Sequence, residues 1–136
     1  MARWYLMIFL FSSFLLATDA TQAAKQLGVQ HSYATAIAKA KAKKRMLVMV
    51  LVKEHCRWCH KLVKHTLADK KVKARLKKDY VTLIVDKDDA YPTVFKRSFF
   101  PSILYIDPNT EKNIYENVGY IGPEYFLNDL KNMLIK

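Results

Sequence analysis

The sequence predicts an α/β fold in which a mixed sheet of about four strands has helices on both faces. Two continuously apolar, β-branched segments, 46–52 and 80–86, have the composition of strands that are buried on both sides. Helical periodicity lies between them, and such a strand–helix–strand unit places its strands parallel with a right-handed crossover. A hairpin and a last helix follow, so the order of elements predicts a sheet that is covered on both faces.

Before the first strand, one segment lacks helical periodicity and the next one has it. Residues 21–31 have no clear periodicity, and we expect them to form a linker. From Ser32, a suitable N-cap, apolar residues recur at the spacing of one helix face, with lysines on the opposite face. We therefore expect one domain over residues 32–136, which opens with this helix and continues into the strand 46–52.

The second half of the domain is predicted from caps and turns. Asp69 is expected to cap a helix that leads into the strand 80–86. Residues 99–107 and 114–119, joined by a polar turn, indicate an antiparallel hairpin. Pro123 stands near the first position of a last helix, where proline is favoured.

The first twenty residues have the pattern of a signal peptide. Arg3 supplies a positive charge, residues 4–17 form an apolar run of about 14 residues, and small residues follow up to Ala20. The run is shorter than the roughly 20 residues that span a bilayer as a helix. We therefore expect cleavage near Ala20 and export, to the periplasm, with an uncleaved membrane-anchored form as the alternative.

The chain is strongly basic, with a formal net charge of +11. Its lysines concentrate in residues 39–45 and 69–79, where they follow helical spacing and have no aromatic residues between them. This pattern is typical of solvated helix faces, and we expect no nucleic-acid partner. Attraction to an anionic membrane surface or to an acidic partner stays open.

Both cysteines of the chain, Cys56 and Cys59, lie in the segment LVKEHCRWCHKL, directly after the first strand. Two cysteines so close in sequence close almost no loop, so a bond between them is a poor stabilising cross-link. At the start of a helix, free N–H groups and a partial positive charge favour the thiolate of Cys56, and Cys59 lies one turn further on. This arrangement predicts that Cys56 attacks a substrate disulfide and that Cys59 resolves the mixed disulfide.

The side chains around this pair are expected to modulate it. His55 and Arg57 add positive potential that lowers the pKa of Cys56. Glu54 and His60 are candidates for the general base that serves Cys59. Trp58 is predicted to form part of the surface that contacts the substrate.

The same residues fit two other kinds of site. Cys56, Cys59 and His60 match the pattern of c-type haem attachment, although small c-type cytochromes consist mostly of helices and loops rather than long strands. The two thiolates could also bind Cu(I). We expect no cofactor and no metal, and we keep as the alternative a haem or Cu(I)-binding protein whose cysteines do not turn over.

With these elements, residues 32–136 resemble the thioredoxin superfamily, specifically its exported thioredoxin-like members. The resemblance predicts a thioredoxin-like fold and a redox-active disulfide between the two cysteines. Four features carry it: the strand MLVMVLV that leads into Cys56-x-x-Cys59, the strand YVTLIVD, Pro101 in the segment FFPSI, and the end VGYIGPEYFLNDL.

The resemblance also implies a substrate groove. It predicts a cis peptide bond between Phe100 and Pro101 beside Cys56, where the backbone of Phe100 pairs with an extended substrate segment. Gly119 matches a glycine that lets the substrate approach closely.

Three positions depart from the family pattern. Val50 stands where many thioredoxins have a buried Asp, Thr82 where a lysine is frequent, and His55 where Trp is usual. Another group must therefore transfer the proton of Cys59. The departures favour a specialised exported reductase or isomerase over an oxidant. We expect it to act as a monomer on protein substrates, with a membrane or soluble thiol as its electron partner.

Overall fold

The structure, a computed structural model, describes residues 19–134 of the chain. The expected signal peptide lies outside these residues except for Asp19 and Ala20, which begin helix α1, and its cleavage near Ala20 stays a prediction. Among the described residues no helix is long and apolar enough to cross a membrane. Their elements are, in order, α1 (Asp19–Leu27), α2 (Tyr33–Lys43), β1 (Met46–Val52), α3 (Arg57–Lys61), η1 (Leu62–Leu67), α4 (Lys70–Asp79), β2 (Tyr80–Asp86), η2 (Thr93–Phe95), β3 (Ser102–Asp107), β4 (Lys112–Val118) and α5 (Pro123–Asn132).

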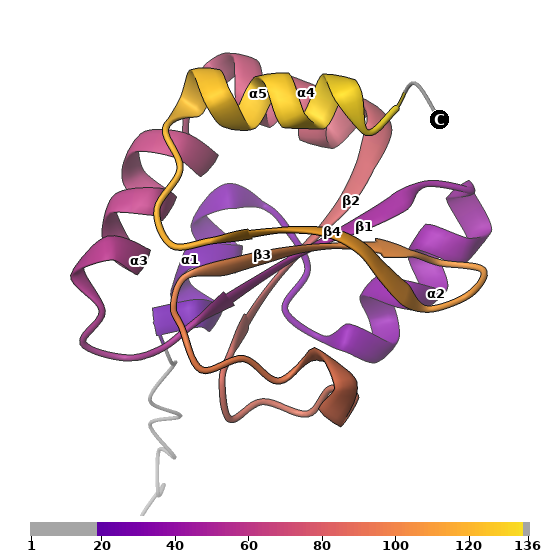
Figure 1. The fold of residues 1–136 in the computed structure, drawn as a ribbon, viewed down its shortest axis with the longest axis horizontal. Coiled ribbons are helices and arrows are strands. Elements are labelled where there is room, and N and C mark those ends of the chain that lie inside the picture. The colour runs from indigo at the N-terminus through magenta and orange to yellow at the C-terminus, as the bar shows by residue number, and fades with distance from the viewer. Residues whose placement is uncertain (1–18, 135–136) are drawn as a thin grey trace, which may run out of the picture.

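The four strands form one mixed sheet in the order β2-β1-β3-β4. β1 and β2 are parallel, in a register that runs from Met46 opposite Tyr80 to Val52 opposite Asp86. β3 is antiparallel to both β1 and β4. In Figure 1 the sheet crosses the middle of the molecule, with α4 and α5 above it and α2 below it. The predicted α/β class, with helices on both faces of the sheet, is confirmed.

Strand alternation divides the core into two layers. Val48, Val50 and Val52 of β1 face the layer that also contains the buried residues of α1, α3, α4 and α5. The intervening residues of β1 face α2 on the other side. Both faces of the strand are covered, which is why its sequence is continuously apolar instead of alternating.

The expectation of a linker over residues 21–31 is wrong, because helix α1 occupies most of this segment. Ala20, Ala23 and Ala24 form its buried face, and such small side chains give little hydrophobic periodicity in the sequence. After the helix, Gln30 bonds to the edge of β2: its N–H donates to the carbonyl of Thr82 and its carbonyl accepts from Ile84. The packed domain therefore includes α1.

The two expected N-caps behave differently. Asp69 Oδ1 accepts hydrogen bonds from the N–H groups of Lys71 and Val72, at 3.0 and 3.1 Å. Ser32 occupies the N-cap position of α2, but its hydroxyl makes no capping hydrogen bond. Only the first of these caps therefore satisfies the free N–H groups of its helix with a side chain.

We expect Asp69→Ala to lower the free energy of unfolding by about 1 kcal/mol, since it leaves two N–H groups of α4 without a partner. Ser32→Ala is the matched control and should change the stability by less than about 0.5 kcal/mol. Urea unfolding followed by circular dichroism measures both. Equal losses in the two variants would contradict this account of the caps.

The segment after α3 does not continue as the regular helix that its apolar pattern predicts. Residues Leu62–Leu67 form a π-helical turn, η1. Within it, the buried hydroxyl of Thr66 donates to the carbonyl of Ile121 at 2.6 Å. This bond fixes the loop before α5 against the helical segment that begins at the cysteine motif.

Candidate active site

The two cysteines lie at the junction of β1 and α3 and are joined as a disulfide. Cys56 is the N-cap of α3, and the N–H of Cys59 donates to Cys56 Sγ at 3.2 Å. In the reduced protein the same N–H is placed to stabilise a Cys56 thiolate. Cys56 and Cys59 are 6% and 4% exposed, so exposure alone hardly separates their roles.

The groups around each sulfur distinguish Cys56 from Cys59 more clearly. Cys56 Sγ lies 4.0 Å from the carbonyl oxygen of Phe100, on the side of the loop before β3. Cys59 instead lines a pocket of about 180 Å³ between α1 and α3. Cys56 therefore faces the loop expected to bind substrate, and Cys59 faces the pocket beside α1. The division of labour between the two cysteines stays a prediction.

The loop before β3 lies beside Cys56. The peptide bond between Phe100 and Pro101 is cis. The N–H of Gly119 donates to the carbonyl of Pro101 at 2.7 Å, which joins this loop to the end of β4. Gly119 has a φ of +87°, a left-handed conformation that favours glycine, and a Cβ there would contact nothing within 4 Å. The backbone conformation, rather than a close approach within the fold, therefore accounts for this glycine.

An aromatic and cationic cluster surrounds the predicted surface residue Trp58. The Trp58 ring is 45% exposed and lies 5.9 Å from that of Tyr120, between ring centroids. Lys61 Nζ lies 5.1 Å from the Trp58 ring and 4.6 Å from the Tyr120 ring. Arg57 Cζ lies 5.2 Å from the Trp58 ring. Tyr120 was not predicted as a site residue, because it reaches Trp58 only through the folded loop before α5.

The remaining predicted modulators lie on the surface. His55 is exposed and has a φ of +54°, so it makes the turn that leads from β1 into α3. Glu54 is exposed beside it. His60 Nε2 lies 3.6 Å from Asp19 Oδ2 of α1, and both residues line the pocket that contains Cys59. His60 therefore adjoins Cys59, whereas Glu54 lies on the exposed segment before Cys56.

A buried carboxylate that the sequence analysis missed lies on the same face of the sheet. Asp86 ends β2 directly opposite Val52, and its alternation with Tyr80 and Ile84 directs it to the layer of the disulfide. Its Oδ1 accepts from the N–H of Asp88 at 3.0 Å. Its Oδ2 is buried and has no hydrogen-bond partner in the described part of the chain. The sequence signal for Asp86 is an acidic residue at the end of a buried strand, two positions after Ile84, which faces the same layer.

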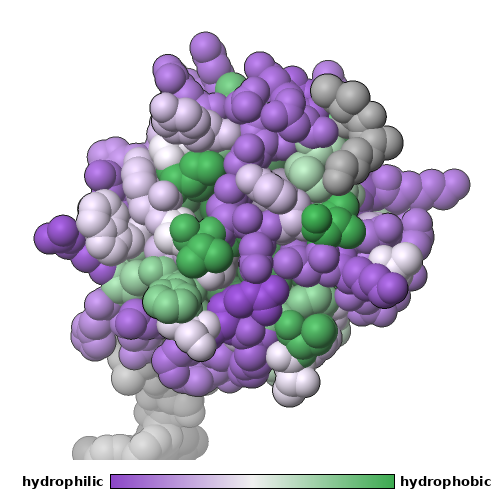
Figure 2. Space-filling view, viewed as in Figure 1, coloured by the Kyte–Doolittle hydropathy of each residue, from purple (hydrophilic) through white to green (hydrophobic). Residues whose placement is uncertain are grey.

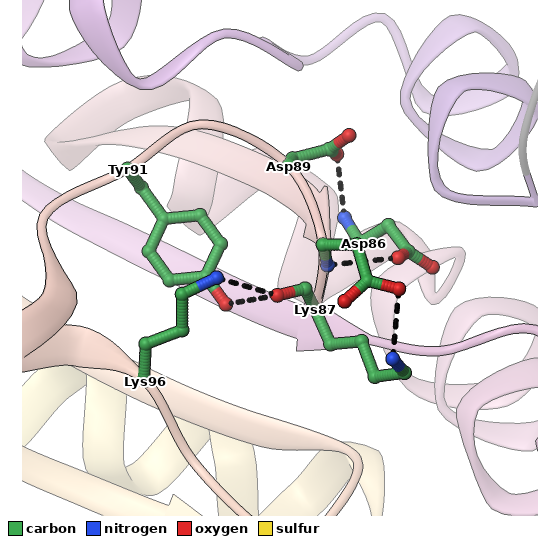
Figure 3. Close-up of polar contacts among 6 residues, drawn as sticks. Asp86, Lys87, Asp89, Tyr91 and Lys96 are labelled. Atoms are coloured by element: carbon green, nitrogen blue, oxygen red, sulfur yellow. Dashed lines mark hydrogen bonds and ion pairs between the residues drawn. The ribbon is translucent and has the colours of Figure 1, made fainter.

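Polar contacts hold the loop after Asp86 in a closed conformation (Figure 3). The Tyr91 hydroxyl and the Lys96 ammonium group both donate to the carbonyl of Lys87 at 2.9 Å. Burial, followed by the charges of the neighbouring carboxylates, raises the pKa of Tyr91, so its hydroxyl stays protonated and can donate. Within residues 19–134 no group of three His, Cys, Asp or Glu side chains is placed to hold a metal ion. Asp86 and Asp89 accept backbone N–H groups of this loop and so help to fix its conformation.

A disulfide at a strand-to-helix junction, facing a cis-proline loop on a four-stranded mixed sheet, defines a thioredoxin-like thiol:disulfide oxidoreductase. The model of a family described as thioredoxin-like matches residues 29–108, and the chain belongs to this family. A search of curated proteins finds no significant match.

Solved structures share the fold. A thioredoxin from Thermus thermophilus matches with a TM-score of 0.70 and 22% identity, over 79% of this chain and 88% of its own. A DsbH oxidoreductase matches with a TM-score of 0.63 and 17% identity, over 77% of this chain and 83% of its own. A disulphide isomerase from Xylella fastidiosa Temecula1 matches with a TM-score of 0.61 and 16% identity, over 88% and 97%.

Proposed function

We propose that the protein is an exported reductase or isomerase of protein disulfides that acts as a monomer through Cys56 and Cys59. The observation that carries this proposal is the disulfide itself, with Cys56 Sγ next to the carbonyl of Phe100 in the cis-proline loop. The apolar run 4–17 and the small residues after it support export to the periplasm. The similarity to an oxidoreductase and a disulphide isomerase supports the class of substrate.

The proposed reaction begins with the reduced protein. The Cys56 thiolate attacks one sulfur of the substrate disulfide, a mixed disulfide forms, and the other substrate sulfur leaves as a thiolate that takes up a proton. Cys59 then loses its proton and attacks Cys56 Sγ, which releases the second substrate thiol and leaves the Cys56–Cys59 disulfide. A membrane-bound or soluble dithiol returns the pair to its reduced form. In isomerisation a substrate thiol attacks the mixed disulfide instead, and no net electrons are transferred.

Substrate binding is assigned to Trp58, Phe100 and Pro101. The backbone of Phe100 adjoins Cys56, and the half-exposed Trp58 ring provides an apolar contact beside it. An extended substrate segment lying along this loop would bring its disulfide to Cys56 Sγ. We prefer this function to the haem and Cu(I) alternatives, and membership of a thioredoxin-like family with the two cysteines paired supports that preference.

Turnover assays test the proposal. Reduced protein should accelerate the reduction of insulin disulfides by dithiothreitol and the recovery of activity by scrambled ribonuclease. A reductase should accelerate the reduction of insulin more, and an isomerase should accelerate the recovery of ribonuclease activity more. If neither rate exceeds that of dithiothreitol alone, the proposed function is wrong.

Among the candidate bases for Cys59, Asp86 is favoured by its burial. It is 7% exposed, faces the layer of the disulfide and keeps one carboxylate oxygen without a hydrogen-bond partner among the described residues. His60 is half-exposed, and Glu54 is exposed. With Val50 in place of a buried acid, Asp86 supplies a carboxylate on the face that contains Cys59.

We expect Asp86→Asn to slow the attack of Cys59 on the mixed disulfide by at least about tenfold at neutral pH, as the loss of a general base does. The amide can still accept the N–H of Asp88, so the loop should keep its conformation. Asp88→Asn, at an exposed position, is the matched control. Rapid-quench mass spectrometry of the mixed disulfide between pH 5 and 8 measures the step. An unchanged rate and pH profile in Asp86→Asn would exclude this role.

A further inference from the structure

Three cationic side chains of the segment that contains the disulfide, those of Lys53, Arg57 and Lys61, each lie over an aromatic ring. Lys53 Nζ lies 5.9 Å from the centre of the Phe100 ring, which belongs to the loop before β3. Arg57 lies over Trp58, and Lys61 over both Trp58 and Tyr120. Two of the three thus flank the half-exposed Trp58, and the third adjoins the residue whose carbonyl faces Cys56.

These three cations have no carboxylate partner within the described residues. Elsewhere on the domain basic residues do form ion pairs, such as Arg75 with Asp79 and Arg97 with Glu116. A cation over an aromatic face is attracted by the ring but keeps donors free for a second partner. The rings therefore hold the charges beside the disulfide without neutralising them.

Exposed apolar side chains also lie near the loop that contains the cis bond. Figure 2 shows that on the face in view the hydrophobic residues form separate patches among hydrophilic ones. Near the loop, Phe99 is exposed next to the cis bond, and Val118 is exposed opposite Ser102 at the start of β3. Small apolar patches among uncompensated cations fit a segment that carries both apolar and acidic side chains.

We propose that the preferred substrates carry acidic residues beside their disulfide, and that Lys53, Arg57 and Lys61 bind these residues and set the specificity. This inference rests on the proposed function and specifies the substrate class of the same site. Carboxylates of an extended segment at Phe100 would meet the three cations on either side of Cys56. The expected preference is about tenfold in kcat/KM, because several exposed charge pairs contribute a few-fold each, and salt should weaken it.

The cations have a second effect, which the kinetics can distinguish from the binding of substrate carboxylates. Positive charge beside Cys56 also stabilises its thiolate, and this effect acts on every substrate alike. Binding of substrate carboxylates changes the ratio between acidic and neutral substrates. The ratio of kcat/KM values therefore separates the two roles.

The experiment uses three disulfide peptides that differ only in the residues flanking one cysteine. These residues are Asp and Glu in the acidic peptide, Asn and Gln in the neutral peptide, and Lys in the basic peptide. Their reduction by the full protein with dithiothreitol is followed by fluorescence dequenching at low and high salt. Lys61→Glu and Lys61→Gln are compared with Lys112→Glu, which makes the same charge change at the far end of β4. We expect Lys61→Glu to abolish or reverse the acidic preference, Lys61→Gln to reduce it, and Lys112→Glu to retain it.

The outcomes distinguish this inference from the function on which it rests. Equal kcat/KM for the three peptides, or a loss in Lys61→Glu that is the same for all three, overturns the acidic specificity and leaves disulfide reduction intact. Failure to reduce any of the peptides, and insulin as well, overturns both. A preference for the acidic peptide that persists in Lys61→Glu as in Lys112→Glu removes Lys61 from the specificity site.

Discussion

Replacement of Cys56 by serine is expected to abolish catalysed reduction of protein disulfides, down to the rate measured without the protein. The sulfur of Cys56 adjoins the Phe100 carbonyl and accepts the N–H of Cys59, so we expect it to be the thiolate that attacks the substrate. A serine hydroxyl is not ionised at neutral pH and cannot form the mixed disulfide. The insulin reduction assay measures the loss.

Cys59→Ser is the informative companion to this variant. It keeps the attacking thiol and removes the resolving one, so the mixed disulfide with a substrate should accumulate. Non-reducing electrophoresis and intact mass would show a covalent complex with Cys59→Ser and none with Cys56→Ser. A complex formed by Cys56→Ser and not by Cys59→Ser would reverse the assigned roles.

The largest expected loss of stability follows removal of Phe126, which is completely buried in the layer that also contains the disulfide. Phe126→Ala deletes a ring that packs between α5 and the sheet and leaves a cavity. We expect the free energy of unfolding to fall by about 3–5 kcal/mol, which is a large part of the stability of a small domain. Urea unfolding with an unchanged m-value would measure it.

The neighbouring residue on the same helix gives a matched control. Tyr125 is 76% exposed, so Tyr125→Ala should change the free energy of unfolding by no more than about 0.5 kcal/mol. A similar loss in both variants would indicate that α5 contributes through helix formation and not through the burial of Phe126. A small loss in Phe126→Ala would contradict the described core.

The sequence predicts the strands of this fold better than its first helix. Segments 46–52 and 80–86 form the strands β1 and β2, because long apolar β-branched runs have few other stable environments. The fully buried residues of helix α1 are all alanines, whose burial contributes little hydrophobic signal, so its packing against the sheet was not predicted. The π-helical turn Leu62–Leu67 keeps apolar spacing close to that of an α-helix, so periodicity does not distinguish the two.

The residues of the candidate site also differ in how well the sequence predicts them. Cys56 and Cys59 are close in sequence, so their pairing follows from spacing and from the strand before them. Trp58 and Tyr120 meet only because the loop before α5 is fixed against the helical segment, and no local pattern records such a contact. Asp86 ends a strand whose partner and facing layer are known only once the sheet is formed.

The measurement that tests the central claim most directly is the reduction potential of the Cys56–Cys59 couple. The protein is equilibrated across a dithiothreitol or glutathione series, free thiols are alkylated, and the two redox forms are quantified by intact mass. We predict one two-electron couple between about −270 mV, as in thioredoxin, and about −180 mV, as in protein disulfide isomerase. A value near about −120 mV would identify an oxidant, and the absence of a titratable couple would contradict thiol–disulfide exchange at this site.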